Sequence, residues 1–405
     1  MENPKIRFKG FTKDWEQRKL IDYLEVSSEK NRDNRFTKED VLSVSGEYGI
    51  VNQIEFQGRS FAGASVSNYG VVENGDVVYT KSPLKSNPYG IIKTNKGIPG
   101  IVSTLYAVYK PKEITDSKFV QIYFELDSRM NSYMHPLVNK GAKNDMKVSA
   151  ENALKGMVSF PKKDEQEMIS LYFSTLDNLI TLHQRKCEQT KKLKKYMLQK
   201  MFPQNGAKVP EIRFYGFTYD WEQRKLGDVF EQTLNLVNPK EDEIELWSLT
   251  VEDGLTKKSD RYNREFLVKK DDNFKEVRPG DIVYNPMNMT LGAVGYNGMA
   301  KSVAVSGYYT TMVAKENYDT YYINTWLKSP QAIRLYRTYA TGSLIEKQRV
   351  QFPTLSIIPV TFPKYEEQIK IGSYFHSIDN LITLHQRKCD ELKKMKKYML
   401  QNMFI

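Results

Sequence analysis

Residues 177–187 read DNLITLHQRKC, and residues 379–389 read DNLITLHQRKC again. A second identical pair lies further toward the N-terminus, where DWEQRKL at residues 14–20 returns at residues 220–226. The stretches between these matching segments share little with each other. Two near-identical frames around two different inserts predict an internal repeat. They favour one common partner for the frames and a different target for each insert.

The composition bounds the class of protein. A chain of 405 residues is long enough for two hydrophobic cores, and 40% hydrophobic with 27% charged residues is typical of soluble globular proteins. We find no apolar run of the roughly 18 residues that a membrane helix needs, and no secretory signal at the start. The two cysteines occupy matching places in the repeat, which favours a reducing cytoplasm over a disulfide scaffold. The net charge of +11 favours a polyanionic partner.

Each repeat is predicted to begin with a mixed body of helices and strands. Short runs rich in Val, Ile and Tyr, separated by Gly and Pro, are typical of strands and turns. Matching Gly-Asp turns lead into matching strands, and a helical stretch follows in each copy. The expected turns are Gly75-Asp76 and Gly280-Asp281, the strands 77–79 and 281–284, and the helical stretches 117–133 and 321–339.

Each repeat is predicted to end with one long helix, which begins after Pro161 in the first copy and after Pro363 in the second. Acidic residues cluster at its start and lysines toward its end, as the helix dipole favours. A seven-residue apolar repeat in both helices predicts a two-stranded coiled coil, whose companion row opens at Tyr172 and Tyr374. The expected seam residues are Ile169, Leu176, Leu179, His183, Leu193, Met197, Ile371, Ile378, Leu381, His385, Leu392 and Met399.

The two helices are expected to pair in antiparallel fashion. A helix of about 38 residues is roughly 57 Å long, which is too long for one small body to cover. Only the short segment 203–210 links the first helix to the second body, and an antiparallel pair needs no long loop. The alternative is that each helix packs along its own body.

These expectations combine into an α+β architecture with pseudo-two-fold internal symmetry, in which two mixed bodies are joined by an antiparallel coiled coil. The expected parts are a first body at 1–161, a first spacer helix at 162–202, a linker at 203–210, a second body at 211–363 and a second spacer helix at 364–405.

A search for catalytic motifs gives no candidate. The sequence has no Gly-x-x-x-x-Gly-Lys-[Ser/Thr] phosphate loop, no Gly-rich cofactor loop after a strand and no credible nucleophile with its base. The segment 285–288, Asn-Pro-Met-Asn, is similar to part of the Asn-Pro-Pro-aromatic loop of amino-methyltransferases, but it lacks the second proline and the aromatic residue, and we interpret it as a turn. We therefore predict no catalytic residue and no cofactor in this chain.

The sequence contains one candidate set of metal ligands. His183 with Cys187, and His385 with Cys389, stand four residues apart on predicted helices, a spacing that places each pair on one face. Brought together, the four side chains would match a tetrahedral zinc set. The alternative is a polar layer that fixes the register of the coiled coil. We favour the polar layer and predict no metal site.

Polar and basic residues crowd the Gly-rich loops of both bodies. Arg and Lys side chains can bind guanine, Asn and Gln can bind adenine, and all of them can hold phosphates, although surface loops are polar in any protein. The lysine clusters of the helices are by default a solvated face, and alternatively follow a phosphate backbone or an acidic partner. The DNA-contact candidates are Asn52, Gln53, Gln57, Arg59, Lys81, Ser82, Lys93, Lys143 and Asn144 in the first body, and Lys257, Lys258, Arg261, Arg264, Asn285, Asn288, Lys301, Lys347 and Arg349 in the second.

With its repeat, its long helices and its divergent bodies, the chain resembles the specificity subunit of a type I restriction–modification enzyme over essentially its whole length. The resemblance rests on the twin DWEQRKL segments, the Gly-Asp turns, the Val-Ser-x-x-Tyr-like stretches 102–106 and 305–309, and the Pro-x-x-x-Glu-Gln helix openings at Pro161 and Pro363. No single element is decisive, but all of them in order, twice, are specific.

The resemblance implies a non-catalytic, cytoplasmic, prokaryotic subunit whose two target-recognition domains each read one half of a gapped site in double-stranded DNA. It implies that the helices set the gap and bind two methylation subunits, which carry S-adenosylmethionine and can be joined by two translocating nuclease subunits. The family does not associate with membranes. The alternatives are a coiled-coil scaffold that bridges two proteins without reading DNA, and a fused single-chain methyltransferase, against which the missing cofactor motif argues.

Overall fold

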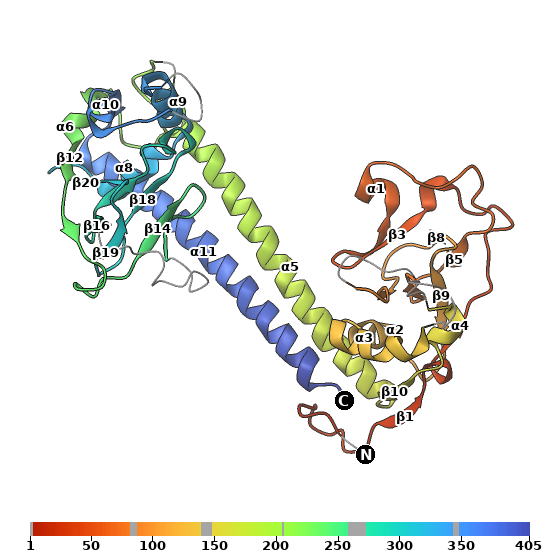
Figure 1. The fold of residues 1–405 in the computed structure, drawn as a ribbon. Coiled ribbons are helices and arrows are strands. Elements are labelled where there is room, and N and C mark those ends of the chain that lie inside the picture. The colour runs from red at the N-terminus through yellow and green to blue at the C-terminus, as the bar shows by residue number, and fades with distance from the viewer. Residues whose placement is uncertain (1–2, 82–86, 139–147, 205, 258–272, 343–347) are drawn as a thin grey trace. The chain divides into compact units, whose positions relative to one another are not determined.

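The computed structural model describes residues 3–81, 87–138, 148–204, 206–257, 273–342 and 348–405. The chain divides into two compact units (Figure 1). Unit 1 comprises Met1–His183 with Lys388–Ile405, and unit 2 comprises Gln184–Arg387. Each unit therefore contains one body together with a segment of both long helices, and the helices do not form a unit of their own.

Unit 1 is built on a four-stranded antiparallel sheet in the order β2-β9-β6-β7, with a β3–β4 hairpin and a β5–β8 pair beside it. A frame pair, β1–β10, joins the two ends of the body. The elements are β1 (Glu16–Lys19), β2 (Leu24–Val26), β3 (Leu42–Ser45), β4 (Gly49–Asn52), α1 (Gln53–Gln57), β5 (Gly70–Val72), β6 (Val77–Tyr79), β7 (Ile92–Thr94), β8 (Gly100–Val102), β9 (Ala107–Pro111), α2 (Ser117–Tyr123), α3 (Asp127–Met134), α4 (Ala150–Ala153), β10 (Met157–Phe160) and α5 (Lys163–Lys200), with short 3-10 turns η1 (Leu20–Asp22), η2 (Lys38–Asp40) and η3 (His135–Leu137).

Unit 2 repeats this plan, with the sheet order β12-β20-β17-β18, a β14–β15 hairpin, a β13-β16-β19 sheet and the frame pair β11–β21. The elements are β11 (Glu222–Lys225), α6 (Leu226–Val229), β12 (Phe230–Thr233), β13 (Leu236–Val237), β14 (Trp247–Thr250), β15 (Gly254–Lys257), β16 (Phe274–Val277), β17 (Ile282–Tyr284), η4 (Met289–Leu291), β18 (Val294–Tyr296), β19 (Val303–Ser306), β20 (Thr310–Ala314), α8 (Thr320–Leu327), α9 (Pro330–Tyr339), α10 (Phe352–Ser356), β21 (Pro359–Phe362) and α11 (Tyr365–Asn402).

The repeated DWEQRKL segment forms the first strand of each frame pair. Glu16 lies opposite Phe160 in β1–β10, and Glu222 lies opposite Phe362 in β11–β21. The Trp side chain of each copy, Trp15 or Trp221, is buried in its core, whereas the Glu-Gln-Arg-Lys side chains are exposed. Each body is thus an insert between two antiparallel strands, the second of which leads directly into a long helix.

The Gly-Asp turns sit where the sequence predicts them, before β6 and β17. Gly75 and Gly280 have φ of +92° and +90°, a left-handed conformation that favours glycine. The carboxylate that follows closes each turn, since Asp76 accepts the Glu73 amide at 2.8 Å and Asp281 accepts the Arg278 amide at 2.9 Å. Burial raises the pKa of Asp281.

The helical stretches predicted at 117–133 and 321–339 are each two helices. In unit 2, Ser329 caps the second helix by accepting the Ala332 amide, and Pro330 occupies its first turn. Proline is favoured at that position and cannot continue a preceding helix. The apolar periodicity continues across the break because both helices face the same core, which is why one helix was expected.

Within unit 1, the segments of α5 and α11 run antiparallel. Phe173 contacts Phe404 at a ring distance of 6.0 Å, and four residues further along α5, Asp177 accepts a hydrogen bond of 2.7 Å from Lys396. The partner residue therefore moves toward the start of α11 as α5 advances. Phe404 also packs against Trp15 and Phe119, so the end of α11 is part of the core of unit 1.

Within unit 2 the two helices also run antiparallel, but here the last part of α5 lies against the first part of α11. Phe202 stacks on Phe375 at 6.0 Å, Lys194 pairs with Asp379 at 2.5 Å, and the buried Cys187 thiol lies near the Ile382 carbonyl. These are the repeat equivalents of the contacts in unit 1. In each unit the alternative of a helix packing only along its own body is therefore wrong.

The predicted seam is correct in one row and wrong in the other. Ile169, Leu176, Ile371 and Ile378 are buried, but Leu179, Leu193 and Leu381 are exposed. The buried companions follow one residue later, at Phe173, Ile180 and Cys187 in α5 and at Phe375 and Cys389 in α11. In a heptad repeat, successive seam positions are separated alternately by three and four residues. Where two apolar residues are adjacent, as Leu179 and Ile180 are, the sequence fits either order of these spacings. His183, Met197, His385, Leu392 and Met399 are half-buried.

Candidate nucleic-acid interface

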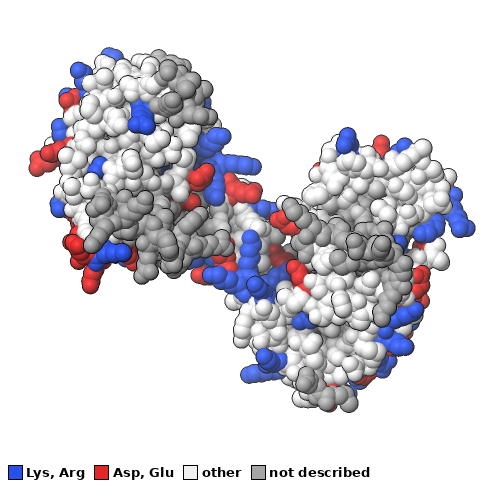
Figure 2. All heavy atoms as spheres, in the orientation of Figure 1, with Lys and Arg blue, Asp and Glu red and all other residues white. Residues whose placement is uncertain are grey.

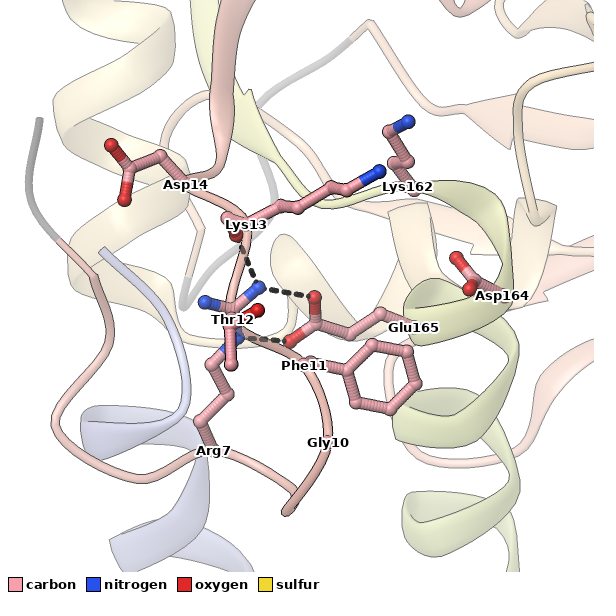
Figure 3. Close-up of a pocket in the computed structure, with 9 residues that line it drawn as sticks. All are labelled: Arg7, Gly10, Phe11, Thr12, Lys13, Asp14, Lys162, Asp164 and Glu165. Carbon is pink, nitrogen blue, oxygen red and sulfur yellow. Dashed lines mark hydrogen bonds and ion pairs between the residues drawn. The ribbon is translucent and has the colours of Figure 1, made fainter.

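The Pro-x-x-x-Glu-Gln opening of each long helix holds the frame together. In unit 1, Glu165 accepts two hydrogen bonds of 2.7 Å from Arg7, near the N-terminus (Figure 3). The next residue, Gln166, accepts the Asp116 amide and donates to the Pro161 carbonyl. The hydrogen bonds to Glu165 raise the pKa of Arg7. The pocket drawn there contains this internal ion pair, so we assign it a structural role.

The same clamp recurs in unit 2. Arg213 donates two hydrogen bonds of 2.7 Å to Glu367, and Gln368 accepts the Asp319 amide at 3.0 Å while donating to the Pro363 carbonyl at 2.9 Å. Much of the identity between the frames is therefore explained by internal contacts. The exposed Glu-Gln-Arg-Lys segments of β1 and β11 also share an internal contact, since Arg18 donates to Glu16 and Arg224 donates to Glu222.

In the first body, the structure separates the DNA-contact candidates into internal and exposed groups. Asn52 caps α1, accepting the Ile54 and Glu55 amides at 2.9 and 3.2 Å, and donates to the Glu39 carbonyl. Gln53 donates to Ser43 and accepts the Phe61 amide. Both amides thus stabilise the hairpin and helix rather than facing outward. Gln57 and Arg59 are exposed.

The two described lysine candidates of the first body are also partly internal. Lys81 donates to the Thr104 carbonyl at 2.7 Å, and Lys93 is only 8% exposed. Burial lowers the pKa of both ammonium groups. Lys93 is therefore placed in the interior of unit 1, with Glu125 as a nearby carboxylate. Ser82, Lys143 and Asn144 lie outside the described residues.

In the second body, two candidates converge on one carboxylate. Lys257 and Lys301 each lie 3.2 Å from Glu245, which also accepts a hydrogen bond from the Trp247 indole. The hydrogen bonds from Trp247, Lys301 and Lys257 lower the pKa of Glu245 to about 2. Both lysines are exposed, and with Glu245 they form a charged surface cluster between the β14–β15 hairpin, which ends at Lys257, and the β18–β19 connection, which carries Lys301.

The remaining candidates of the second body have simpler environments. Asn285 accepts the Met287 amide and shapes its own turn, Asn288 is exposed at the start of η4, and the Arg349 backbone pairs with Thr341. The interpretation of 285–288 as a turn is thereby confirmed. Lys258, Arg261, Arg264 and Lys347 lie outside the described residues.

The structure reveals one group of side chains that the sequence search missed. Tyr48, Phe56 and Phe61, on the β3–β4 hairpin and α1, are 62%, 45% and 56% exposed. The Tyr48 and Phe56 rings lie 5.5 Å apart, and the Arg59 guanidinium lies 4.6 Å above the Phe61 ring. These three lie in the β3–β4 turn, in α1 and in the loop after α1. Phe is most often buried and Tyr usually at least partly covered, so the sequence alone gives no signal that the three are exposed.

On the face shown in Figure 2, Lys and Arg side chains alternate with Asp and Glu and with wide uncharged areas. Among the described residues, no group of three or more His, Cys, Asp and Glu side chains is placed to hold a metal ion. The same part of the chain contains no helix with the length and apolarity to cross a bilayer.

Comparison with known proteins shows which family this chain resembles. Residues 219–394 match the family described as the type I restriction modification DNA specificity domain. A protein of Methanocaldococcus jannaschii, named for the specificity subunit of the MjaX type I restriction enzyme, is 22% identical over 430 aligned positions, covering 96% of this chain and 92% of that protein. The crystal structure of the type I restriction-modification S subunit from M. genitalium has the same fold, with a TM-score of 0.62, 12% identity and coverage of 100% of this chain and 99% of that chain. Residues 219–394 thus carry a type I restriction modification DNA specificity domain, and nearly the whole chain is similar to specificity subunits.

Proposed function

We propose that this chain, as a type I restriction–modification specificity subunit, reads a bipartite DNA site, with one half-site for each body. The observation that carries the proposal is that two bodies with the same strand order, held in the same frame, present different side chains at the same places. A shared scaffold with unlike surfaces is suited to two unlike targets. The rival role, a scaffold that reads no DNA, gives no reason for the bodies to differ while their frames stay the same.

The long helices set the distance between the half-sites. Within unit 1, α5 and α11 are joined by Lys396–Asp177, and within unit 2 by Lys194–Asp379. In both units the two helices are thus held together in antiparallel fashion. A paired helix is stiff over its length, and a fixed separation between two readers fixes the spacing of the sequences they read, as in dimeric DNA-binding proteins.

Selection from random duplexes tests this function. The chain would be assembled with its methylation subunit and allowed to bind a random DNA library, and the bound fraction would be sequenced. A split consensus with an unread gap supports the proposal. Uniform weak binding without a consensus would instead support the scaffold.

Exchange of one body is expected to change one half of the site. Residues 227–357, which lie between β11 and β21, would be replaced by the corresponding body of another specificity subunit. Because the frame clamp Arg213–Glu367 is retained, the new body should close on the same strands. Sequencing of methylated adenines in host DNA should then give a new second half-site and an unchanged first. Altered reading of both halves would contradict independent bodies.

The helices also carry a surface suited to a common partner. Each unit presents four large apolar side chains that are between 38% and 56% exposed. In unit 1 they are Leu179, Leu182, Met395 and Tyr398, and in unit 2 they are Leu381, Leu384, Leu193 and Tyr196. Positions 179, 182, 193 and 196 correspond in the repeat to 381, 384, 395 and 398, so each unit carries the same set of exposed apolar positions, which we call the apolar stripe. Two copies of one surface fit two methylation subunits, which would hold the S-adenosylmethionine and the catalytic residues that this chain lacks in our proposal. Two nuclease subunits would join through them.

Charging this stripe should block assembly. The double variant Leu182→Glu with Leu384→Glu introduces one carboxylate into each apolar surface, and burying an unpaired charge costs several kcal/mol, by an order-of-magnitude estimate. The affinity of the variant for the methylation subunit should fall by at least about a hundredfold. Analytical ultracentrifugation of mixtures of the two proteins measures this change. The control is Thr181→Glu with Thr383→Glu, at neighbouring exposed positions. Equal loss in both variants, or no loss in either, would argue against this docking surface.

A further inference from the structure

The β3–β4 hairpin and α1 lie next to each other in unit 1 (Figure 1). This small module, with the loop that follows α1, carries exposed aromatic side chains and one exposed arginine. Its backbone is fixed from within: Asn52 caps α1, and Gln53 bonds both Ser43 and the Phe61 amide. The side chains used for this purpose are polar, while Tyr48, Phe56 and Phe61 are left on the outside. Exposed aromatic rings on a rigid module are costly to leave in water unless a ligand covers them.

Arg59 is held in place although it makes no hydrogen bond through its guanidinium among the described residues. Gly58 ends α1 with φ of +77° and its amide bonds the Ile54 carbonyl at 2.7 Å, and on the other side the Phe61 amide is bonded to Gln53. The guanidinium lies 4.6 Å over the Phe61 ring. Stacking on an aromatic face restricts the long side chain while it leaves the edge of the planar fork free to donate.

The same module position in unit 2 carries different chemistry. An isolated parallel bridge docks the hairpin in both units, Val41 with Ile101 in unit 1 and Leu246 with Ala304 in unit 2. The unit 2 hairpin, β14–β15, carries Lys257 beside Glu245 and Lys301 instead of an arginine on an aromatic ring. The hairpin is therefore docked through the same backbone bridge in both units but carries different side chains. Such a segment is suited to contact a different target in each body.

We propose that Arg59, positioned by Phe61, forms a two-pronged hydrogen bond with a guanine in the half-site that the first body reads. The inference rests on the proposed function and names a specificity determinant within it. The guanidinium fork matches the O6 and N7 acceptors that guanine presents in the major groove, a pattern that no other base offers. Because stacking on Phe61 already limits the rotamers of Arg59, less conformational freedom is lost on binding.

The test uses the assembled complex and its own consensus duplex, with each base pair of the site replaced in turn in competition assays. Arg59→Ala should weaken binding to the consensus roughly tenfold to a hundredfold and abolish discrimination at one G·C pair of the first half-site. Arg59→Lys should not restore that discrimination, since an ammonium lacks the fork. Phe61→Ala should give a partial loss at the same base pair, and Phe61→Trp, which retains an aromatic face, should recover it.

Two controls make the result specific. Ile98→Ala removes another exposed apolar side chain of unit 1 and should bind as the unchanged protein does. Retained discrimination at the second half-site, together with an unchanged circular dichroism spectrum, shows that each variant is folded. Weakening by Arg59→Ala that is equal for all sequences, with a salt slope reduced by about one, would mean a phosphate contact and would overturn the inference. Unchanged binding would overturn it as well. If the unchanged complex itself selected no gapped consensus, the proposed function would fail before this question arose.

Discussion

Inserting seven residues into each long helix, after His183 in α5 and after His385 in α11, lengthens the gap between the two half-sites by about three base pairs. The insertions add about 10 Å of helix, and a base pair occupies about 3.4 Å of the duplex. Both lie within two residues of the boundaries between unit 1 and unit 2, so the internal contacts of each unit are preserved apart from the one between Cys187 and Gln386. Seven residues also keep the heptad in register. Sequencing of methylated adenines reads out the new gap.

Two controls show whether the helices act as a ruler. Four-residue insertions at the same points disturb the heptad and twist the later part of each helix against its partner, and should abolish methylation rather than change the gap. A seven-residue insertion in α5 alone leaves the helices mismatched and should have the same result. If the double insertion left the gap unchanged, the half-sites would be spaced by something other than these helices.

Phe404→Ala is expected to lower the free energy of unfolding of unit 1 by about 3–5 kcal/mol, the usual cost of truncating a buried phenylalanine. The Phe404 ring is 6% exposed and lies within 6.2 Å of Trp15, Phe119 and Phe173. Arg129 lies 4.7 Å above the same ring and donates to the Leu400 carbonyl. Removal of the ring therefore leaves a cavity where the first body, α5 and α11 meet.

Hydrogen exchange followed by mass spectrometry measures this effect separately in the two units. Amides of unit 1 should lose protection while those of unit 2 keep it, and reading of the first half-site should fail before reading of the second. Phe202→Ala should give the mirror result, because Phe202 fills the equivalent place in unit 2 against Trp221, Tyr322 and Phe375. Ile405→Ala, at a half-exposed neighbour, is the control. Equal loss of protection in both units after Phe404→Ala would contradict the assignment of this residue to unit 1.

The repeat made much of this fold predictable from sequence. Agreement between two copies located the Gly-Asp turns before β6 and β17, the starts of both long helices and the frame strands, because each feature had to satisfy the same local chemistry twice. The seam was harder. Leu179 and Ile180 are adjacent and equally apolar, and only the partner helix decides which is covered. Lys194 and Lys396 lie in the same companion row, which made the row harder to recognise from sequence. A lysine is not expected in a seam while its carboxylate partner is unknown.

The candidate interface was less predictable, for a physical reason. Asn52 and Gln53 have the residue types that read adenine, but the same amides are equally good at capping a helix or bridging two strands. Which role they fill depends on a hairpin whose partners lie up to 13 residues away in the sequence, such as Glu39 for Asn52. Tyr48, Phe56 and Phe61 were missed for the converse reason, since composition favours a buried aromatic until the packing shows it outside.

The placement of residues 388–405 within unit 1 has a consequence for synthesis on the ribosome. Translation completes all of unit 2, residues 184–387, before it supplies the segment that fills the core of unit 1. Domains usually fold as they emerge, with the N-terminal one first. Here the order is reversed, because the second body can fold while the core of the first is still incomplete. A nascent chain that stalls within α11 would therefore have a folded second body and an unfinished first body.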